Sequence, residues 1–165
     1  MTMAILGGCS NLPSNPPGPP PLPSGWKTVD YHGVGVDVPS DWMVEPWHQN
    51  CGVNTPTVFI GPEQLSVLSC PAFTPGGAEV VLGSLPFKGA GPHAQSENVN
   101  GLTAQVVSET MDAQCGHRTT TFSKAWVTLP AKGFTISISA AESPVCRGGS
   151  PGMATQIQGS IHEIH

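Results

Sequence analysis

The chain has 165 residues, of which 10% are charged, with a formal net charge of −5, 20 glycines and 18 prolines. This length fits one folded domain with a tail, and the abundance of glycine and proline excludes long helices. The six basic residues are scattered, which excludes the phosphate-neutralising stripe of a nucleic-acid-binding protein, and no apolar run is long enough to span a bilayer.

The N-terminal residues Leu6-Gly7-Gly8-Cys9 resemble the lipobox of bacterial lipoprotein signals, where diacylglycerol is attached to the cysteine thiol and the signal is removed. The resemblance implies that residues 1–8 are a truncated signal remnant and that Cys9 is the lipid attachment site. It also implies a cell-membrane protein, lipid-anchored (palmitate) on the extracytoplasmic face. The alternative is a cytoplasmic chain that happens to carry a cysteine near its start.

A proline-rich stretch follows, and residues 9–25 are predicted to be the lipid-attachment cysteine and a tether. Seven prolines between Asn11 and Ser24, without periodic apolar residues, favour a semi-rigid polyproline stalk. At about 3.1 Å per residue the stalk would reach roughly 45 Å. The alternative use of such a segment is as a ligand for an SH3-like domain.

The folded domain is expected to occupy residues 26–165. Residues 26–31 and 34–38 are β-rich runs around a His32-Gly33 turn and predict a strand pair, with a third short strand at 42–44. Tyr31–Trp42, in which the pair ends in Pro-x-x-Trp, resembles the opening of Mog1/PsbP-like domains. The resemblance implies a fold of that type.

Residues 51–70 predict a second hairpin. The runs 57–60 and 65–68 are rich in β-formers and flank a Gly-Pro turn signal at Gly61, with Cys51 and Cys70 on either side. Further along, strands are expected at 78–82 and 102–107 and an exposed loop at 86–96.

Scattered positions along the domain are similar to small exported lipoproteins of mycobacteria and related actinobacteria, namely Cys51, Phe59-Ile60-Gly61, Cys70-Pro71 and Ile157–Ile161. Members of this group generally have no assigned activity. The resemblance therefore implies a location and a fold, and no chemistry.

The clearest structural signal lies between Thr119 and Ala140. Two β-runs flank Pro130-Ala131-Lys132-Gly133, and a loop centred between Ala131 and Lys132 predicts a hairpin. Three apolar pairs should then share one face: Ala125 with Ile138, Val127 with Ile136, and Leu129 with Phe134. Phe122 and Trp126 should lie on the opposite face, either covered by a loop or exposed as a binding surface.

A C-terminal helix is expected to cover the apolar face of this hairpin. Ser150 before Pro151 is typical of a helix N-cap with proline at the first position, and Met153, Ala154, Ile157 and Ile161 recur at helical spacing. The predicted fold is therefore α+β: mainly antiparallel hairpins packed against a C-terminal helix.

The four domain cysteines allow three pairings, and hairpin geometry favours Cys51–Cys70 and Cys115–Cys146. Each bridge should add roughly 3 kcal/mol and requires an oxidising compartment. A four-cysteine zinc site is disfavoured because closely spaced pairs such as C-x₂-C are absent.

The candidates for chemistry are few. Gly148-Gly149-Ser150-Pro151-Gly152 matches the G-x-S-x-G pattern, but too few residues follow for a downstream acid and histidine. His162, Glu163 and His165 lie at a terminus that holds metal ligands poorly. We therefore expect no catalytic residue, metal or cofactor.

Three function classes follow from these observations. The favoured one is a non-enzymatic extracytoplasmic lipoprotein that binds an envelope protein, lipid or other envelope component, and not nucleic acid. The second is a lipid or small-molecule carrier with an apolar pocket between helix and sheet. The third, and least favoured, is a serine hydrolase using Ser150.

Overall fold

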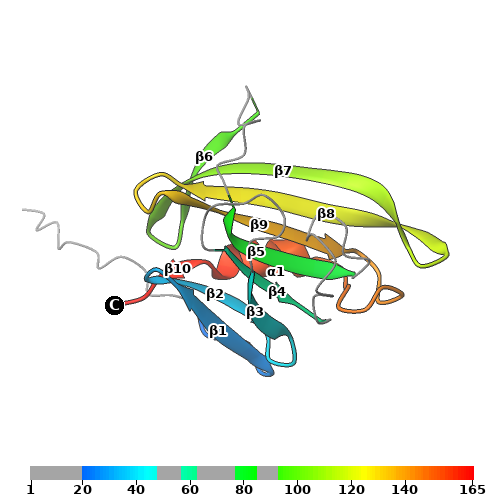
Figure 1. Ribbon diagram of the computed structural model, residues 1–165. Helices are drawn as coiled ribbons and strands as arrows, with labels where there is room; N and C mark the ends of the chain where they lie inside the picture. The colour runs from blue at the N-terminus through cyan, green and yellow to red at the C-terminus, as the bar shows by residue number, and fades with distance from the viewer. Residues whose placement is uncertain (1–19, 48–56, 63–76, 85–92) are drawn as a thin grey trace, which may run out of the picture.

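The computed structural model describes residues 20–47, 57–62, 77–84 and 93–165, and these residues have the α+β organisation expected from the sequence (Figure 1). The strands and the helix in chain order are β1 (Trp26–Tyr31), β2 (Val34–Pro39), β3 (Met43–Trp47), β4 (Thr57–Gly61), β5 (Ala78–Ser84), β6 (Gln95–Val99), β7 (Leu102–Cys115), β8 (Arg118–Leu129), β9 (Phe134–Ala141), α1 (Met153–Ser160) and β10 (His162–Glu163).

The strands form two antiparallel sheets. The larger has the order β3-β4-β5-β9-β8-β7-β6, and the smaller has the order β1-β2-β10. Helix α1 contacts β2 of the small sheet and β8 and β9 of the large sheet, so one apolar core fills the space between the helix and both sheets. In Figure 1 the β7–β8 ribbon extends past the neighbouring strands to a turn at its far end.

The central hairpin β8–β9 has the predicted register. Leu129 pairs with Phe134, Val127 with Ile136 and Ala125 with Ile138, and all six side chains belong to the core. The loop closes because the N–H groups of Lys132 and Gly133 both donate to the Leu129 carbonyl oxygen, at 3.0 and 2.9 Å. Gly133 has a φ of 76°, a conformation that glycine adopts without steric cost.

The predicted apolar stripe of α1 also faces the core. Ala154 is 3% exposed, Ile157 and Ile161 are fully buried, and Met153 packs against the same cluster. From the small sheet, Val34, Val36 and Val38 join that cluster with no exposed surface. Burying each such aliphatic side chain contributes about 1.5–3 kcal/mol, which is why this eight-residue helix is stable in the fold.

The start of the helix corrects the sequence analysis, because Ser150 is not its N-cap. The N-cap is Gly152, with a φ of 74° and no side-chain cap. Ser150 instead accepts the Met153 N–H at its backbone oxygen, at 3.1 Å. A carboxylate takes over part of the capping role, since Glu142 Oε2 accepts the Gly152 N–H at 2.7 Å.

Other elements differ in extent or partner from those expected. Strand β4 pairs with β3 on one side and β5 on the other, so its predicted pairing with residues 65–68 is wrong; that run lies outside the described residues. Part of the expected 86–96 loop is strand β6, and β7 continues to Cys115 rather than ending near residue 107. Strand β1, strand β2 and strand β5 lie where they were expected.

Candidate functional site

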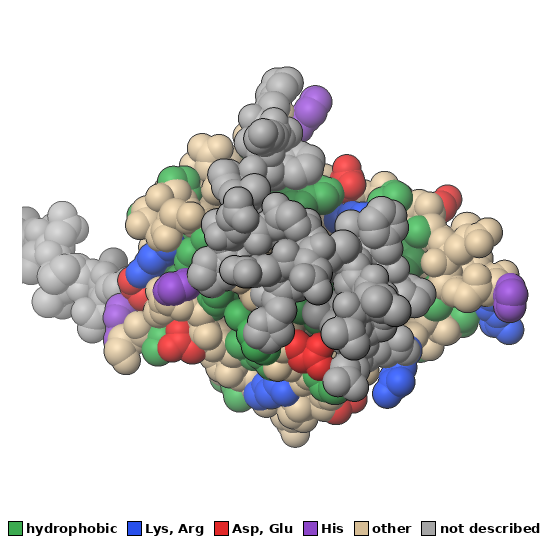
Figure 2. Space-filling view, viewed as in Figure 1, with side chains coloured by type: hydrophobic (Ala, Val, Ile, Leu, Met, Phe, Trp, Pro, Cys, Tyr) green, Lys and Arg blue, Asp and Glu red, His purple; other side chains and the backbone are tan. Residues whose placement is uncertain are grey.

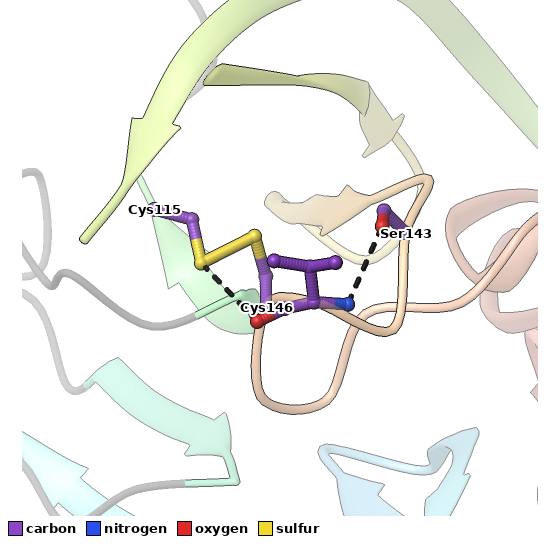
Figure 3. Close-up of a disulfide and its surroundings, with 4 residues drawn as sticks. Cys115, Ser143 and Cys146 are labelled. Carbon is purple, nitrogen blue, oxygen red and sulfur yellow. Dashed lines mark hydrogen bonds between the residues drawn. A yellow bond between two sulfur atoms is a disulfide. The ribbon is translucent and has the colours of Figure 1, made fainter. Parts of the chain in front are cut away.

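A disulfide joins the far end of the β7–β8 ribbon to the segment after β9. Cys115 and Cys146 are bridged, as hairpin geometry predicted, with Cα atoms 5.7 Å apart (Figure 3). The loop that carries Cys146 is held by further backbone bonds, since the Cys146 N–H donates to Ser143 and its carbonyl accepts the Gly149 N–H. Cys51, Cys70 and Cys9 lie outside the described residues, so the second predicted bridge and the lipid site stay predictions.

The bridge also covers Phe122. This ring is 7% exposed and lies in a small cluster with Ala141 and Cys146, against which Ala113 and Cys115 pack. Phe122 and Trp126 are on the sheet face opposite the helix, as expected, because their register partners alternate with the core pairs. The sequence left open whether this face is covered by a loop or exposed as a binding surface. Phe122 is covered, by the loop that carries Cys146, whereas Trp126 is half-buried.

The described residues that best fit a binding site form a groove of about 370 Å³ between α1 and the β7–β8 ribbon. The helix covers β8 and β9 but leaves the outer part of the ribbon open. The groove is lined by polar residues with two alanines at its buried edge: Ser108, Glu109, Thr110, Ser123, Lys124, Ala125, Ala154, Thr155 and Gln158.

The floor of the groove follows from strand alternation. Ala104 and Val106 of β7 are buried in the core, so the next residues of the same parity, Ser108 and Thr110, face the same side. Their register partners on β8 are Ala125 and Ser123. The inward positions therefore change from apolar to hydroxyl where the cover of the helix ends, and this change makes the floor polar.

The polar side chains of the groove are available to a ligand. None of them makes a side-chain hydrogen bond or ion pair with another residue in the described ranges, although Glu109 and Lys124 are directly opposite each other in the register. Across the face seen in Figure 2, acidic and basic side chains are scattered rather than gathered by sign. By the same strand alternation, the side chains of Glu109 and Lys124 point to the opposite face of the sheet, so the groove offers mainly hydroxyl and amide groups.

A second group of polar contacts lies at the end of the molecule opposite the Cys115–Cys146 bridge. Lys132 Nζ donates to Glu163 Oε1 at 2.6 Å, and this hydrogen bond and the ammonium charge lower the pKa of the Glu163 carboxyl. His162 Nδ1 is 2.7 Å from the Ser160 carbonyl oxygen, so Nδ1 carries the proton. The Asn100 side chain donates to the carbonyl oxygens of Gly159 and Ile161, at 2.7 and 2.8 Å.

These contacts explain the terminal histidine and acid as structural groups. Glu163 and His162 are each held by neighbouring residues, and across the described ranges no three histidine, cysteine or acidic side chains gather to hold a metal ion.

Near the first hairpin, Asp30 Oδ1 accepts the Gly33 N–H at 3.0 Å, and the buried Asp37 carboxylate accepts the Thr28 hydroxyl at 2.6 Å.

The groove was not identified from the sequence. Its signal is the switch along β7 from Ala104 and Val106 to Ser108 and Thr110, which becomes meaningful only once the end of the helix cover is known.

No protein-family model, curated protein or solved structure matches the chain. In the part of the chain that the structure describes, no helix is long and apolar enough to cross a membrane.

Proposed function

We propose that this chain is a lipid-anchored extracytoplasmic lipoprotein that acts as a non-enzymatic binding module and holds a polar component of the cell envelope in the groove beside α1. Cys9 carries the lipid, residues 9–25 lift the domain from the membrane, and residues 26–165 form the binding domain. The observation that carries the binding role is the groove, whose hydroxyl and amide groups have no partners among the described residues.

The extracytoplasmic location is supported by sulfur chemistry. A bridge such as Cys115–Cys146 persists in an oxidising compartment and is rare in a reducing cytosol. With these two cysteines paired, Cys51 and Cys70 are left to each other among the four domain cysteines. The similarity of Leu6-Gly7-Gly8-Cys9 to a lipobox and the proline-rich tether support the same location.

Binding is favoured over hydrolysis because the groove lining contains hydroxyl groups without a histidine. A serine or threonine nucleophile needs a neighbouring base to remove its proton. Ser150, the alternative nucleophile, lies in the turn before α1, where its backbone oxygen accepts the Met153 N–H.

The carrier alternative keeps the same location for its ligand, between helix and sheet. A lipid chain needs an apolar lining, but the apolar side chains among the groove residues are those of Ala125 and Ala154 alone. A ligand with hydroxyl, amide or peptide groups fits this lining better than an acyl chain does.

The anchor and the bridges are tested by intact-mass measurement of protein extracted from its own envelope. We expect the mass of a chain beginning at lipid-modified Cys9 and lacking four protons, two for each of two bridges. A mature chain without lipid, or one with free thiols at Cys51, Cys70, Cys115 and Cys146, would contradict the proposed location.

The groove is tested by blocking it with a bulky side chain. Thr155 lines the groove, whereas its neighbour Gln156 is exposed on α1 outside it, so Thr155→Trp and Gln156→Trp form a matched pair. The probe is a soluble muramidase digest of the cell wall of the host, titrated into ¹⁵N-labelled protein. Amide shifts at Ser108, Thr110 and Ser123 should be lost in Thr155→Trp and kept in Gln156→Trp; equal responses in both variants would place the site elsewhere.

A further inference from the structure

Strand β7 is much longer than β6 beside it, so part of its edge has no partner strand among the described residues. Strand β6 pairs with β7 only from Leu102, opposite Val99, to Val106, opposite Gln95. From Val107 to Cys115, β7 pairs with β8 on one side, and no described strand lies on the other side. We call Val107–Cys115 the free edge of β7.

The backbone groups of the free edge point outward at every second residue. Cys115 pairs with Arg118 across a two-residue turn, so these residues form a hydrogen-bonded pair and the odd-numbered residues of β7 bond to β8. The turn between β6 and β7 gives the same phase from the other end, since Val99 pairs with Leu102 across Asn100-Gly101 and the even-numbered residues bond to β6. Ser108, Thr110, Asp112 and Gln114 therefore present their N–H and C=O groups to the open side.

This edge lacks most of the features that protect edges from pairing. It contains no lysine or proline, and the register of β7 with β8 has no bulge. Side chains from 108 to 112 are exposed on both faces, including Met111 at 41%. Its only charges are the carboxylates Glu109 and Asp112.

We propose that the free edge of β7 pairs with the free edge of a second copy of this chain, antiparallel about a two-fold axis at Met111. Met111 is the midpoint of Val107–Cys115, so this register uses the whole edge. The outward-facing residues meet each other: Thr110 faces Asp112 of the second copy, and Ser108 faces its Gln114. Two rows of four such residues would make about eight backbone hydrogen bonds.

The charges select this register over its neighbours. An axis at Glu109 or Asp112 would place two identical carboxylates directly opposite each other, which is destabilising. An axis at Thr110 would set Gln114 against Val106, whose outward groups already bond to β6. About Met111, Glu109 faces Ala113 and Asp112 faces Thr110, so no like charges are opposed.

The second copy also takes the place along β7 that β6 leaves vacant. Its Cys115 lies opposite Val107, which is the residue after the Val106–Gln95 pair where β6 begins. The pairing joins the two large sheets into one continuous sheet. An extended segment of a different protein is the competing occupant, and the experiments below separate the two.

Disulfide trapping tests the register. Met111 of each copy meets Met111 of the other at a non-hydrogen-bonded position, where Cα atoms are about 4.5 Å apart and cysteines can bridge. We expect Met111→Cys to give a reducible covalent dimer under mild oxidation, whereas Thr110→Cys, which faces Asp112, stays uncrosslinked like the wild-type chain. Crosslinking at Thr110→Cys without any at Met111→Cys would overturn the register.

Charge substitution at Thr110 tests the association itself by sedimentation equilibrium. Thr110→Lys creates two lysine–aspartate pairs per dimer and should tighten the dimer Kd about tenfold, whereas Thr110→Asp should weaken it by a similar factor. The same changes at Thr103, in the part of β7 covered by β6, carry the same net charge and should leave Kd unchanged. A wild-type chain that stays monomeric to about millimolar concentration, or equal effects at Thr103 and Thr110, would overturn the proposal in favour of a different occupant.

Discussion

Removing the Cys115–Cys146 bridge is the sharpest test of how the β7–β8 ribbon is held. The two cysteines are 31 residues apart in the sequence, and closing a loop of that length in the unfolded chain corresponds to about 4 kcal/mol in the chain-entropy treatment. Cys146 is fully buried beside Phe122, so Cys115→Ala/Cys146→Ala also leaves a small cavity that costs about 1 kcal/mol. A total of about 5 kcal/mol is a third or more of the stability of an ordinary domain.

The assay is urea unfolding followed by tryptophan fluorescence, with hydrogen exchange as a local measurement. Besides the lower midpoint, we expect faster exchange at Glu142, because its N–H donates to the Thr121 carbonyl oxygen at 2.9 Å next to the bridged segment. Amides in the β1–β2 hairpin provide the comparison, because exchange at Glu142 should accelerate more than exchange there. An unchanged unfolding midpoint would refute the stabilising role given to this bridge.

Three further predictions concern the end of the molecule opposite the bridge. Asn100→Gly should lower the free energy of unfolding in urea by about 2 kcal/mol, because glycine keeps the positive φ of 46° but loses two side-chain hydrogen bonds. Asn100→Ala should lower it by about 1 kcal/mol more, because alanine is strained at that φ; equal stability of all three proteins would contradict this. Burial raises the pKa of Tyr31, the single tyrosine, so its ultraviolet titration should lie above pH 10.0, and the stability that its neutral form contributes should be lost as pH rises from the unfolded pKa through the folded one. For Glu163 the pKa is lowered by Lys132, so its contribution is present above the unfolded pKa and lost as pH falls through the folded one. Lys132→Met should raise the pKa of this carboxyl, measured by NMR titration, and no change would exclude this pairing in solution.

The parts of the fold that the sequence predicted are those specified by local patterns. In β8 and β9, apolar and polar residues alternate and a glycine ends the loop, so register could be derived before any packing was known. The spacing of Ala154, Ile157 and Ile161 marked the buried stripe of α1 in the same way. The Cys115–Cys146 pairing followed because the hairpin brought the two cysteines to one end.

The parts that were missed depend on pairing with another strand rather than on the residue pattern of the strand itself. Residues 108–110 are all polar and interrupt the alternation of β7, and they form a strand because β8 provides a template for pairing. Strand β6 has the polar sequence QSENV, so its strand conformation comes from the hairpin with β7 rather than from propensity. Strand β4 was assigned residues 65–68 as its partner, but it pairs with β3 on one side and β5 on the other.

The candidate site was beyond the reach of local patterns for a related reason. A hydroxyl at Ser108 or Ser123 is ordinary on an exposed strand, and it becomes part of a groove only because α1 ends its cover of the sheet at that point. Ser150 was misassigned as the N-cap because it directly precedes Pro151. The helix begins later in the chain, because Gly152, with its left-handed backbone conformation, is the N-cap.

The placement of α1 and β10 constrains when the domain can fold. Ile157 and Ile161 fill the centre of the structure, yet they follow all the strands of the large sheet in the sequence, and β10 completes a sheet begun at Trp26. A chain threaded through a translocation channel from its N-terminus would therefore emerge almost entirely before its interior could be sealed. Under the proposed extracytoplasmic location, such late closure would keep the polypeptide loose during transit and delay maturation until the whole domain had crossed.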